Sequence, residues 1–163
     1  MASARVFFVL CGISGLLTGT LSDFSINVSA PECPMGWTRL DDRCFIYKSD
    51  LLSFAEAEDA CNTENANLAS LRNNLENALA YQLVRDANGG NIPNTWIGLH
   101  DGIEEGKFVW TDGSKVDFTF FRSDQPDDFQ GREECVEIHI VEERWNDDGC
   151  EDPLGFVCSY DLW

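Results

Sequence analysis

The sequence predicts an α+β fold in which two helices pack on small antiparallel sheets with long polar loops, fastened by three disulfides. Helix patterns lie between about residues 53 and 90, and short strand-like runs separated by polar loops follow Asn91. Helices followed by strands are typical of α+β proteins, whereas alternating βαβ units would indicate a parallel sheet. The six cysteines that follow the N-terminal segment predict the disulfides.

The N-terminus has the pattern of an export signal. Arg5 precedes the apolar run VFFVLCGISGLL, and small residues follow as far as Thr20. A run of about a dozen apolar residues is shorter than the roughly 20 that a membrane-spanning helix needs, and it stands where signal peptides stand. We therefore expect residues 1–20 to be a signal peptide, with cleavage after Thr20 or after Ala30, and a secreted protein.

Secretion gives meaning to the residues that follow. Asn27, in the short segment 21–32, begins an NVS glycosylation sequon if cleavage precedes it. Because Cys11 lies inside the signal, the mature chain keeps an even set of cysteines, namely Cys33, Cys44, Cys61, Cys135, Cys150 and Cys158. Disulfides are the expected chemistry outside the cell, and six cysteines allow 15 pairings between which spacing does not choose.

The formal net charge of −18 and a pI near 4.1 narrow the partners. Nucleic acids and anionic membranes repel such a protein, and no later stretch is apolar enough to insert into a bilayer. Two interpretations of the charge stay open on composition alone. One is an ordinary acidic secreted protein, and the other is charge held for Ca²⁺, a hard cation that takes six to eight oxygen ligands.

The first elements have clear local signals. The run CPMGWTRLDDRCFIY predicts a small hairpin that turns at DDR. Cys33 opens this run, and Cys44 directly follows the turn. Ser53 and Glu56 have the spacing of a capping box, which opens the helix FAEAEDACN and places Cys61 on its core face. A second helix begins near Asn73 or Asn74 and stops at the Gly89-Gly90 pair. Its core stripe is predicted to consist of Leu75, Leu79 and Leu83.

The strands after residue 91 are short. The runs that predict them are TWIGLH, GKFVWTDGS, CVEIHIV, ERWNDDGC and GFVCSYD. In CVEIHIV, Val136, Ile138 and Ile140 alternate with Glu137 and His139, which indicates a half-buried strand whose acid and histidine lie on the polar side, with His139 outward.

Five short motifs in these strands and loops resemble the C-type lectin domain. They occur in the family's order: WIGL at 96–99, QPD at 125–127, EEC at 133–135, WND at 145–147 and GFVC at 155–158. The resemblance covers residues 33–160, and the early cysteine pair resembles the long form of the domain. It implies the pairs Cys33–Cys44, Cys61–Cys158 and Cys135–Cys150. The last pair would bring the two acidic stretches together.

The resemblance also implies a calcium site, with a sugar as its ligand. Matched by motif, the calcium ligands are Gln125, Asp127, Glu133, Asn146 and Asp147. Three of these are carboxylates that repel one another without a metal and become compatible with it. The remaining coordination positions would take vicinal hydroxyls of a sugar. In the family the bond before the motif proline is usually cis, which is our expectation for Gln125–Pro126.

Two further features follow from the resemblance. QPD resembles galactose-type lectins, and Phe129 stands where such domains carry an aromatic that stacks on the sugar, although a plain loop anchor is an equal interpretation. A second calcium would draw its ligands from Asp101, Glu105, Asp128 and Glu134.

The function implied is a calcium-dependent lectin that binds galactose or β-galactosides on cell or microbial surfaces, similar to small soluble lectins of fish and venoms. With all six cysteines paired internally, any homo-oligomer would be non-covalent. Two alternatives stay open: ice binding, as in type II antifreeze proteins on the same fold, and a calcium-independent role in protein interaction. An enzyme is not expected, because His100 and His139 have no nucleophile or orienting group in sight.

Overall fold

The structure is a computed structural model that describes residues 31–139 and 143–162. The expected signal peptide, the sequon at Asn27 and the expected strand residue Ile140 lie outside these ranges. Within the described ranges, no helix has the length and apolar character needed to cross a membrane.

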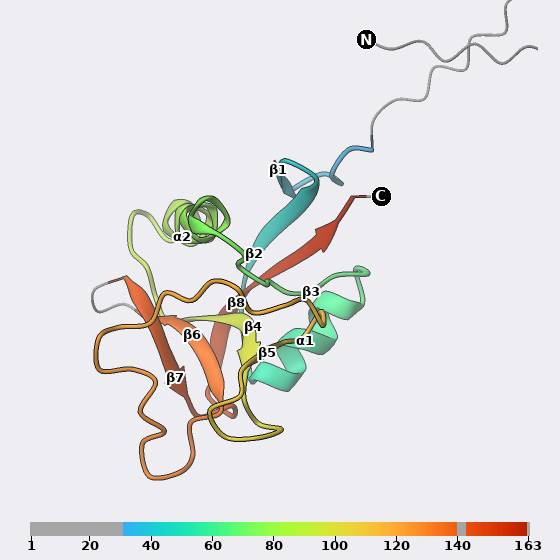
Figure 1. Cartoon of the computed structure of the whole chain (residues 1–163). Coiled ribbons are helices and arrows are strands. Elements are labelled where there is room, and N and C mark those ends of the chain that lie inside the picture. The colour runs from blue at the N-terminus through green and yellow to red at the C-terminus, as the bar shows by residue number, and fades with distance from the viewer. Residues whose placement is uncertain (1–30, 140–142, 163) are drawn as a thin grey trace, which may run out of the picture. The chain divides into compact units, whose positions relative to one another are not determined.

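The strands join in one sheet, in the order β1-β2-β8-β4-β6-β7, with β3 paired to β8 and β5 paired to β4 (Figure 1). Their bounds are β1 Thr38–Leu40, β2 Arg43–Leu52, β3 Asn67–Leu68, β4 Thr95–His100, β5 Val109–Trp110, β6 Cys135–His139, β7 Arg144–Asp148 and β8 Leu154–Asp161. The pairs are antiparallel except β4 with β8, which is parallel. The α+β class is confirmed, although the strands form one sheet with a parallel pair instead of small antiparallel sheets.

The two helices are α1 (Phe54–Asn62) and α2 (Asn74–Ala87), close to the predicted bounds. The predicted capping box is present, since Glu56 N donates to Ser53 Oγ at 3.4 Å and Ser53 N donates to Glu56 Oε2 at 3.1 Å. Asn73 caps α2 by accepting from the backbone N–H groups of Leu75 and Glu76. Side-chain oxygens therefore satisfy N–H groups that a helix start would leave free.

The predicted core stripe of α2 is wrong by about one position. Leu75 is 67% exposed, Leu79 and Leu83 are only partly buried, and the buried set is Glu76, Asn77, Ala80, Tyr81 and Val84. Two polar residues of α2 point inward because they find hydrogen-bond partners from other elements in the interior. Glu76 accepts from Arg43 Nη1 at 2.6 Å, and Asn77 Oδ1 accepts from Trp145 Nε1 at 3.0 Å.

The polar side predicted for β6 is also corrected. Glu137 is fully buried, while His139 is partly exposed. The Glu137 carboxylate accepts from the amide groups of Asn94 at 3.1 Å and Asn146 at 3.4 Å. Alternation along the strand assigned Glu137 to solvent, but neighbouring amide side chains cover that face.

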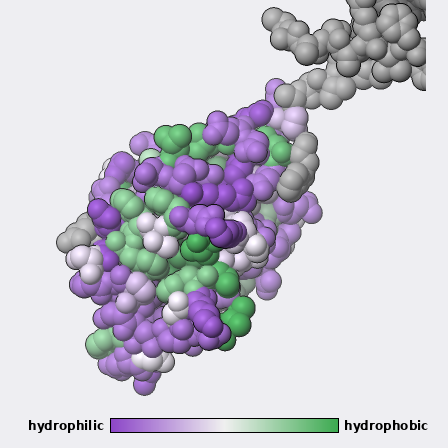
Figure 2. All heavy atoms as spheres, viewed as in Figure 1, coloured by the Kyte–Doolittle hydropathy of each residue, from purple (hydrophilic) through white to green (hydrophobic). Residues whose placement is uncertain are grey.

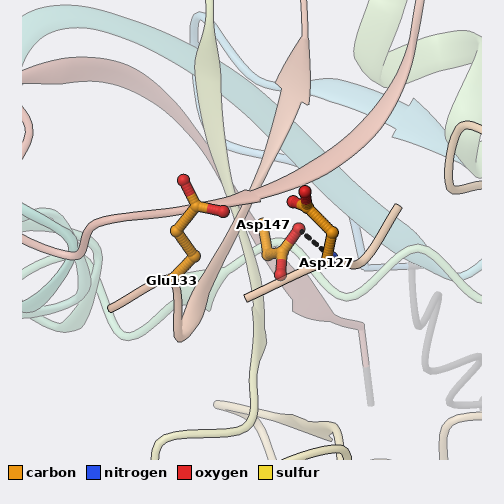
Figure 3. A group of neighbouring side chains, drawn as sticks. All are labelled: Asp127, Glu133 and Asp147. Carbon is orange, nitrogen blue, oxygen red and sulfur yellow. Dashed lines mark hydrogen bonds between the residues drawn. The ribbon is translucent and has the colours of Figure 1, made fainter. Parts of the chain in front are cut away.

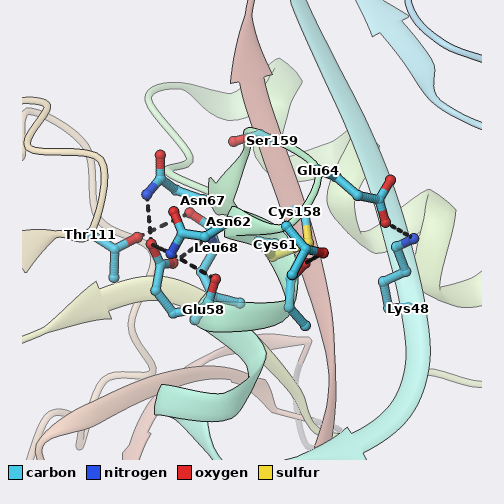
Figure 4. Close-up of a disulfide and its surroundings, with 12 residues drawn as sticks. Lys48, Glu58, Cys61, Asn62, Glu64, Asn67, Leu68, Thr111, Cys158 and Ser159 are labelled. Carbon is cyan, nitrogen blue, oxygen red and sulfur yellow. Dashed lines mark hydrogen bonds and ion pairs between the residues drawn. A yellow bond between two sulfur atoms is a disulfide. The ribbon is translucent and has the colours of Figure 1, made fainter.

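Three disulfides fasten the elements, in the pairs that the family resemblance implied. Cys61–Cys158 joins α1 to β8 across a separation of 97 residues (Figure 4). Beside it, Glu58 accepts from Leu68 N at 2.7 Å and thereby fixes β3 to α1. On the face drawn in Figure 2, hydrophilic residues cover most of the surface and hydrophobic residues gather across its middle.

Gly98, in the WIGL motif, allows the close approach of β3 and β4. A Cβ at this position would lie 2.4 Å from Leu68 O, closer than Cβ atoms approach other heavy atoms in real structures. The motif glycine is therefore required by packing.

Candidate metal site

Strand β7 positions two of the predicted ligands. Trp145 is fully buried and meets Trp110, Phe118 and Phe121 edge-on, with ring centroids 5.7 to 5.8 Å apart. This anchor fixes the backbone of Asn146 and Asp147, which follow it directly. The WND motif thus combines a hydrophobic anchor with two oxygen donors.

The acidic loop, residues 124–134, is held against the same strand. Arg122 N donates to Trp145 O at 3.0 Å, and Cys135–Cys150 ties the other end of the loop to the residues after β7. The loop turns sharply, since Asp128, Gln130 and Gly131 all have positive φ. The Gln125–Pro126 bond is cis, as expected.

Three carboxylates of the predicted primary set converge at this place. Oxygen atoms of Asp127, Glu133 and Asp147, here called the carboxylate cluster, lie within 4.8 Å of one another. Figure 3 shows Asp127 and Glu133, from the acidic loop, on either side of Asp147. Among the described residues, no other group of three or more Asp, Glu, His or Cys side chains reaches this spacing.

Backbone N–H groups orient two members of the cluster. Asp147 accepts from Asp127 N at 3.2 Å and from Asp128 N at 2.8 Å. Glu133 accepts from Phe129 N at 2.8 Å. The loop backbone therefore aims these carboxylates, and among the described residues no arginine or lysine pairs with them.

The two predicted amide ligands are also arranged to offer oxygen. The Nδ2 group of Asn146 donates to Glu137 and to Asp147 O, which leaves its Oδ1 as the acceptor. The Oε1 atom of Gln125 is buried and has no hydrogen-bond partner among the described residues. A buried acceptor without a donor is costly, and a cation would relieve that cost.

The electrostatics agree with a site short of positive charge. Burial raises the pKa of Glu133, and the charges of Asp147 and Asp127 raise it further. Burial also raises the pKa of Asp147, although the backbone N–H groups of Asp128 and Asp127 oppose that shift. Behind them, burial and the charge of Asp148 raise the pKa of Glu137 to about 8.

The four residues predicted for a second calcium lie around the neighbouring loop but do not close to the same spacing. Asp101 is 2% exposed, its Oδ2 accepts from Gly106 N at 2.8 Å, and its Oδ1 has no partner among the described residues. Asp101 N donates to Glu134 O. Desolvation and the charges of Asp101 and Asp128 raise the pKa of Glu105, so the negative charges of Asp101 and Asp128 act on Glu105.

Two residues beside the site were not settled by the sequence: the role of Phe129 was left open, and Glu137 was not predicted. Phe129 is 60% exposed, so its ring is not a packed anchor of the loop. Glu137, which holds the Asn146 amide, was missed as part of the site because the strand pattern placed it in solvent. Its one sequence signal was its place two residues after the motif cysteine, on the strand paired with WND.

Comparison with known proteins gives a consistent result. The profile of the lectin C-type domain family matches residues 50–160. The galactose-specific lectin nattectin of Thalassophryne nattereri is 35% identical over 131 residues, which are 80% of this chain and 82% of that protein. The alpha-N-acetylgalactosamine-specific lectin of Patiria pectinifera is 37% identical over 162 residues, covering 94% and 95%.

Solved structures agree with this. The C-type lectin CEL-I from Cucumaria echinata superposes with a TM-score of 0.72 at 29% identity, covering 79% of this chain and 97% of that one. Herring type II antifreeze protein superposes with a TM-score of 0.73 at 28% identity, covering 80% and 100%. The same fold thus serves a lectin and an antifreeze protein.

Proposed function

This chain belongs to the lectin C-type domain family, and from that premise we propose that it is a secreted, calcium-dependent lectin for galactose or β-galactosides. The carboxylate cluster, with the unpartnered Oε1 of Gln125 beside it in the sequence, is the observation that carries the proposal. The three disulfides support secretion, because such bonds form and persist in oxidising compartments.

The donor set fits Ca²⁺. Three carboxylates and two amide oxygens are hard ligands, and their formal charge of about −3 exceeds that of the ion. The residues that would hold it are Gln125, Asp127, Glu133, Asn146 and Asp147. Bound Ca²⁺ would supply a positive centre that two neighbouring sugar hydroxyls can ligate. The raised pKa values of Glu133 and Asp147 support this assignment, because a cation would stabilise their charged forms.

The protein's own side chains would select the sugar. In QPD, Gln125 has an amide that both donates and accepts, whereas Asp127 only accepts, so the pair prefers one arrangement of hydroxyl protons. Phe129, exposed and anchored by its backbone to Glu133, offers a ring that the apolar face of galactose can cover. Two relatives whose names state galactose or N-acetylgalactosamine specificity support the same class of sugar.

Binding of lactose and of methyl α-mannoside, measured by calorimetry in calcium and in EDTA, tests the proposal. We expect calcium-dependent binding that favours lactose. The double variant Gln125→Glu, Asp127→Asn should shift preference toward mannose. The control Asp124→Asn, Gln130→Glu exchanges acid and amide in the same loop outside the proposed ligand set, and should keep the lactose preference. Lactose binding that persists unchanged in EDTA would contradict the proposal.

A second calcium is a separate proposal on the same loops. The buried, unpartnered Oδ1 of Asp101 and the proximity of Glu105 and Asp128 support it. Calcium stoichiometry by calorimetry should fall from two to one in Asp101→Asn. A stoichiometry of one in the wild-type protein would remove this second site and leave the first.

Ice binding is the second candidate function, because a type II antifreeze protein shares the fold. Thermal hysteresis of the purified protein, together with absent agglutination of red cells, would favour it. Agglutination reversed by EDTA and lactose is the expected result, and it requires more than one sugar site per particle, which a non-covalent homo-oligomer would provide.

A further inference from the structure

A recess elsewhere on the surface differs from the metal site in its residues and in its chemistry. This polar pocket has a volume of about 620 Å³, and its walls come from the start of β2, from β3 and the residues before it, from the turn after β5 and from the end of β8. None of its lining residues belongs to the carboxylate cluster or to the two amides beside it. The volume is in the range of pockets that hold small ligands.

A buried arginine forms a fixed wall of this pocket. Arg43 is 2% exposed, and it donates to Glu76 at 2.6 Å, to Asp161 at 2.7 Å and to Ser159 Oγ at 2.8 Å. It also donates to the carbonyl and the hydroxyl of Ser70, both at 2.9 Å. All its nitrogen atoms are engaged, so Arg43 holds the wall in place and has little capacity left for a ligand.

Arg72, also in the wall, is only partly engaged. Its Nη2 donates to Asp112 and to Asp161, both at 3.2 Å. Its Nε–H group is buried and has no acceptor among the described residues. A buried donor without an acceptor is unfavourable, and each such group in a native protein needs an explanation. A ligand cannot reach this buried Nε atom, but the Nη1 group of Arg72 makes no hydrogen bond among the described residues. Because the side chain is 33% exposed, Nη1 can donate to an acceptor oxygen on a molecule in the pocket.

The charges in the pocket wall indicate which kind of ligand the pocket can bind. The two guanidinium groups of Arg43 and Arg72 face the carboxylates of Asp112 and Asp161, so the lining carries no net charge that would attract an anion. A neutral ligand with several hydroxyls matches such a wall, because each hydroxyl can donate to a carboxylate and accept from a guanidinium.

The remaining wall residues suit a sugar ring. Asn65 is exposed, and the amide nitrogen of Asn67 is bound to Glu58 at 2.6 Å, which leaves the Asn67 carbonyl as an acceptor (Figure 4). We propose that the polar pocket is a second sugar-binding site, one that takes a neutral pyranose unit without a metal.

The test uses the wild-type protein in EDTA, which separates this site from the calcium-dependent one. Methyl β-galactoside and methyl α-mannoside are titrated separately at millimolar concentration while backbone amide resonances are followed by NMR. We expect saturable shifts at the amides of Asn65, Gly113 and Ser114 with at least one of the two sugars. No shift with either sugar, or shifts confined to the acidic loop and β7, would overturn the proposal.

A pair of matched variants tests the wall directly. Arg72→Gln should weaken the EDTA-resistant binding about tenfold or more, the loss expected when hydrogen bonds from a charged donor are removed. Arg85→Gln is the control, because Arg85 has a similar exposed fraction, 35% against 33% for Arg72, and pairs with Glu143 outside the pocket. Equal binding by both variants would show that the pocket is not the site. If the wild-type protein binds sugar equally well in calcium and in EDTA, the proposed calcium-dependent function is contradicted, but the proposal for this pocket is not.

Discussion

Replacing Asp147 by asparagine should separate two roles of its carboxylate, which are to hold the acidic loop and to hold the metal. Asp147 accepts from Asp127 N at 3.2 Å and from Asp128 N at 2.8 Å. Asparagine keeps one acceptor oxygen and replaces the other with an NH₂ group, so one of these bonds is lost. The loss of a hydrogen bond to a charged group costs about 1.5–3 kcal/mol of unfolding free energy.

The lost charge works in the opposite direction. Two unit charges 4.8 Å apart, the limit of spacing in the carboxylate cluster, repel by about 0.9 kcal/mol in water and about 3.5 kcal/mol at an effective dielectric constant near 20. Because Asp127 is exposed, the lower value of the repulsion energy applies. Removing the charge of Asp147 therefore relieves its repulsion with Asp127 and Glu133 by about 1–2 kcal/mol in total. In EDTA the two effects should nearly cancel, leaving the melting temperature within about 4 °C of the wild type.

Calcium should stabilise the wild type much more than Asp147→Asn. At a calcium concentration one hundred times its Kd, the wild type should gain about 2.7 kcal/mol, which is a rise of about 10 °C for a domain of this size. Asp147→Asn should lose most of that rise in thermal unfolding followed by circular dichroism. Asp124→Asn is the control, since Asp124 pairs with Arg122 in the same loop and should keep the full calcium response. A full calcium response in Asp147→Asn would refute the assignment of this carboxylate to the metal.

Three further predictions follow from the same contacts. Because the pKa values of Glu133 and Asp147 are raised, protons should compete with calcium at a higher pH than for ordinary carboxylates, and the calorimetric affinity for calcium should fall as the pH is lowered. Glu137 has a pKa of about 8 in the fold against 4.5 ordinarily, so unfolding releases its proton and metal-free stability should fall as pH rises between these values; Glu137→Gln should flatten urea unfolding free energies over that window, and an unchanged slope would contradict the shift. Replacing both cysteines of Cys61–Cys158 by alanine should cost up to about 4.7 kcal/mol in urea unfolding, against about 2.8 kcal/mol for Cys33–Cys44, because the first pair closes a loop of 97 residues and the second a loop of 11; equal costs would count against loop entropy as the cause.

The sequence was sufficient wherever a feature depends on neighbours along the chain or on a fixed motif. The Ser53–Glu56 capping box, the helix starts and the convergence of the carboxylate cluster belong to this kind. It was insufficient where a polar side chain is buried by partners from distant elements. Glu76 turns inward to meet Arg43, and two asparagines cover Glu137. Counting apolar residues therefore placed the core stripe of α2 about one position off and missed that the polar face of β6 is covered at Glu137.

The crowding of acids before Cys135 is resolved by three different means, and this limits how much calcium is needed. Asp124 is neutralised by Arg122 at 3.1 Å. Asp128 has a left-handed backbone and accepts from Glu133 N through Oδ1 at 3.2 Å, so one of its two oxygens is already committed to shaping the loop. Only the carboxylate cluster combines mutual proximity, burial of Asp147 and the absence, within the described residues, of a side-chain cation among the partners given above. Dependence of the sugar site on a metal should therefore lie with these three side chains, whereas Asp124 should be tolerated without one.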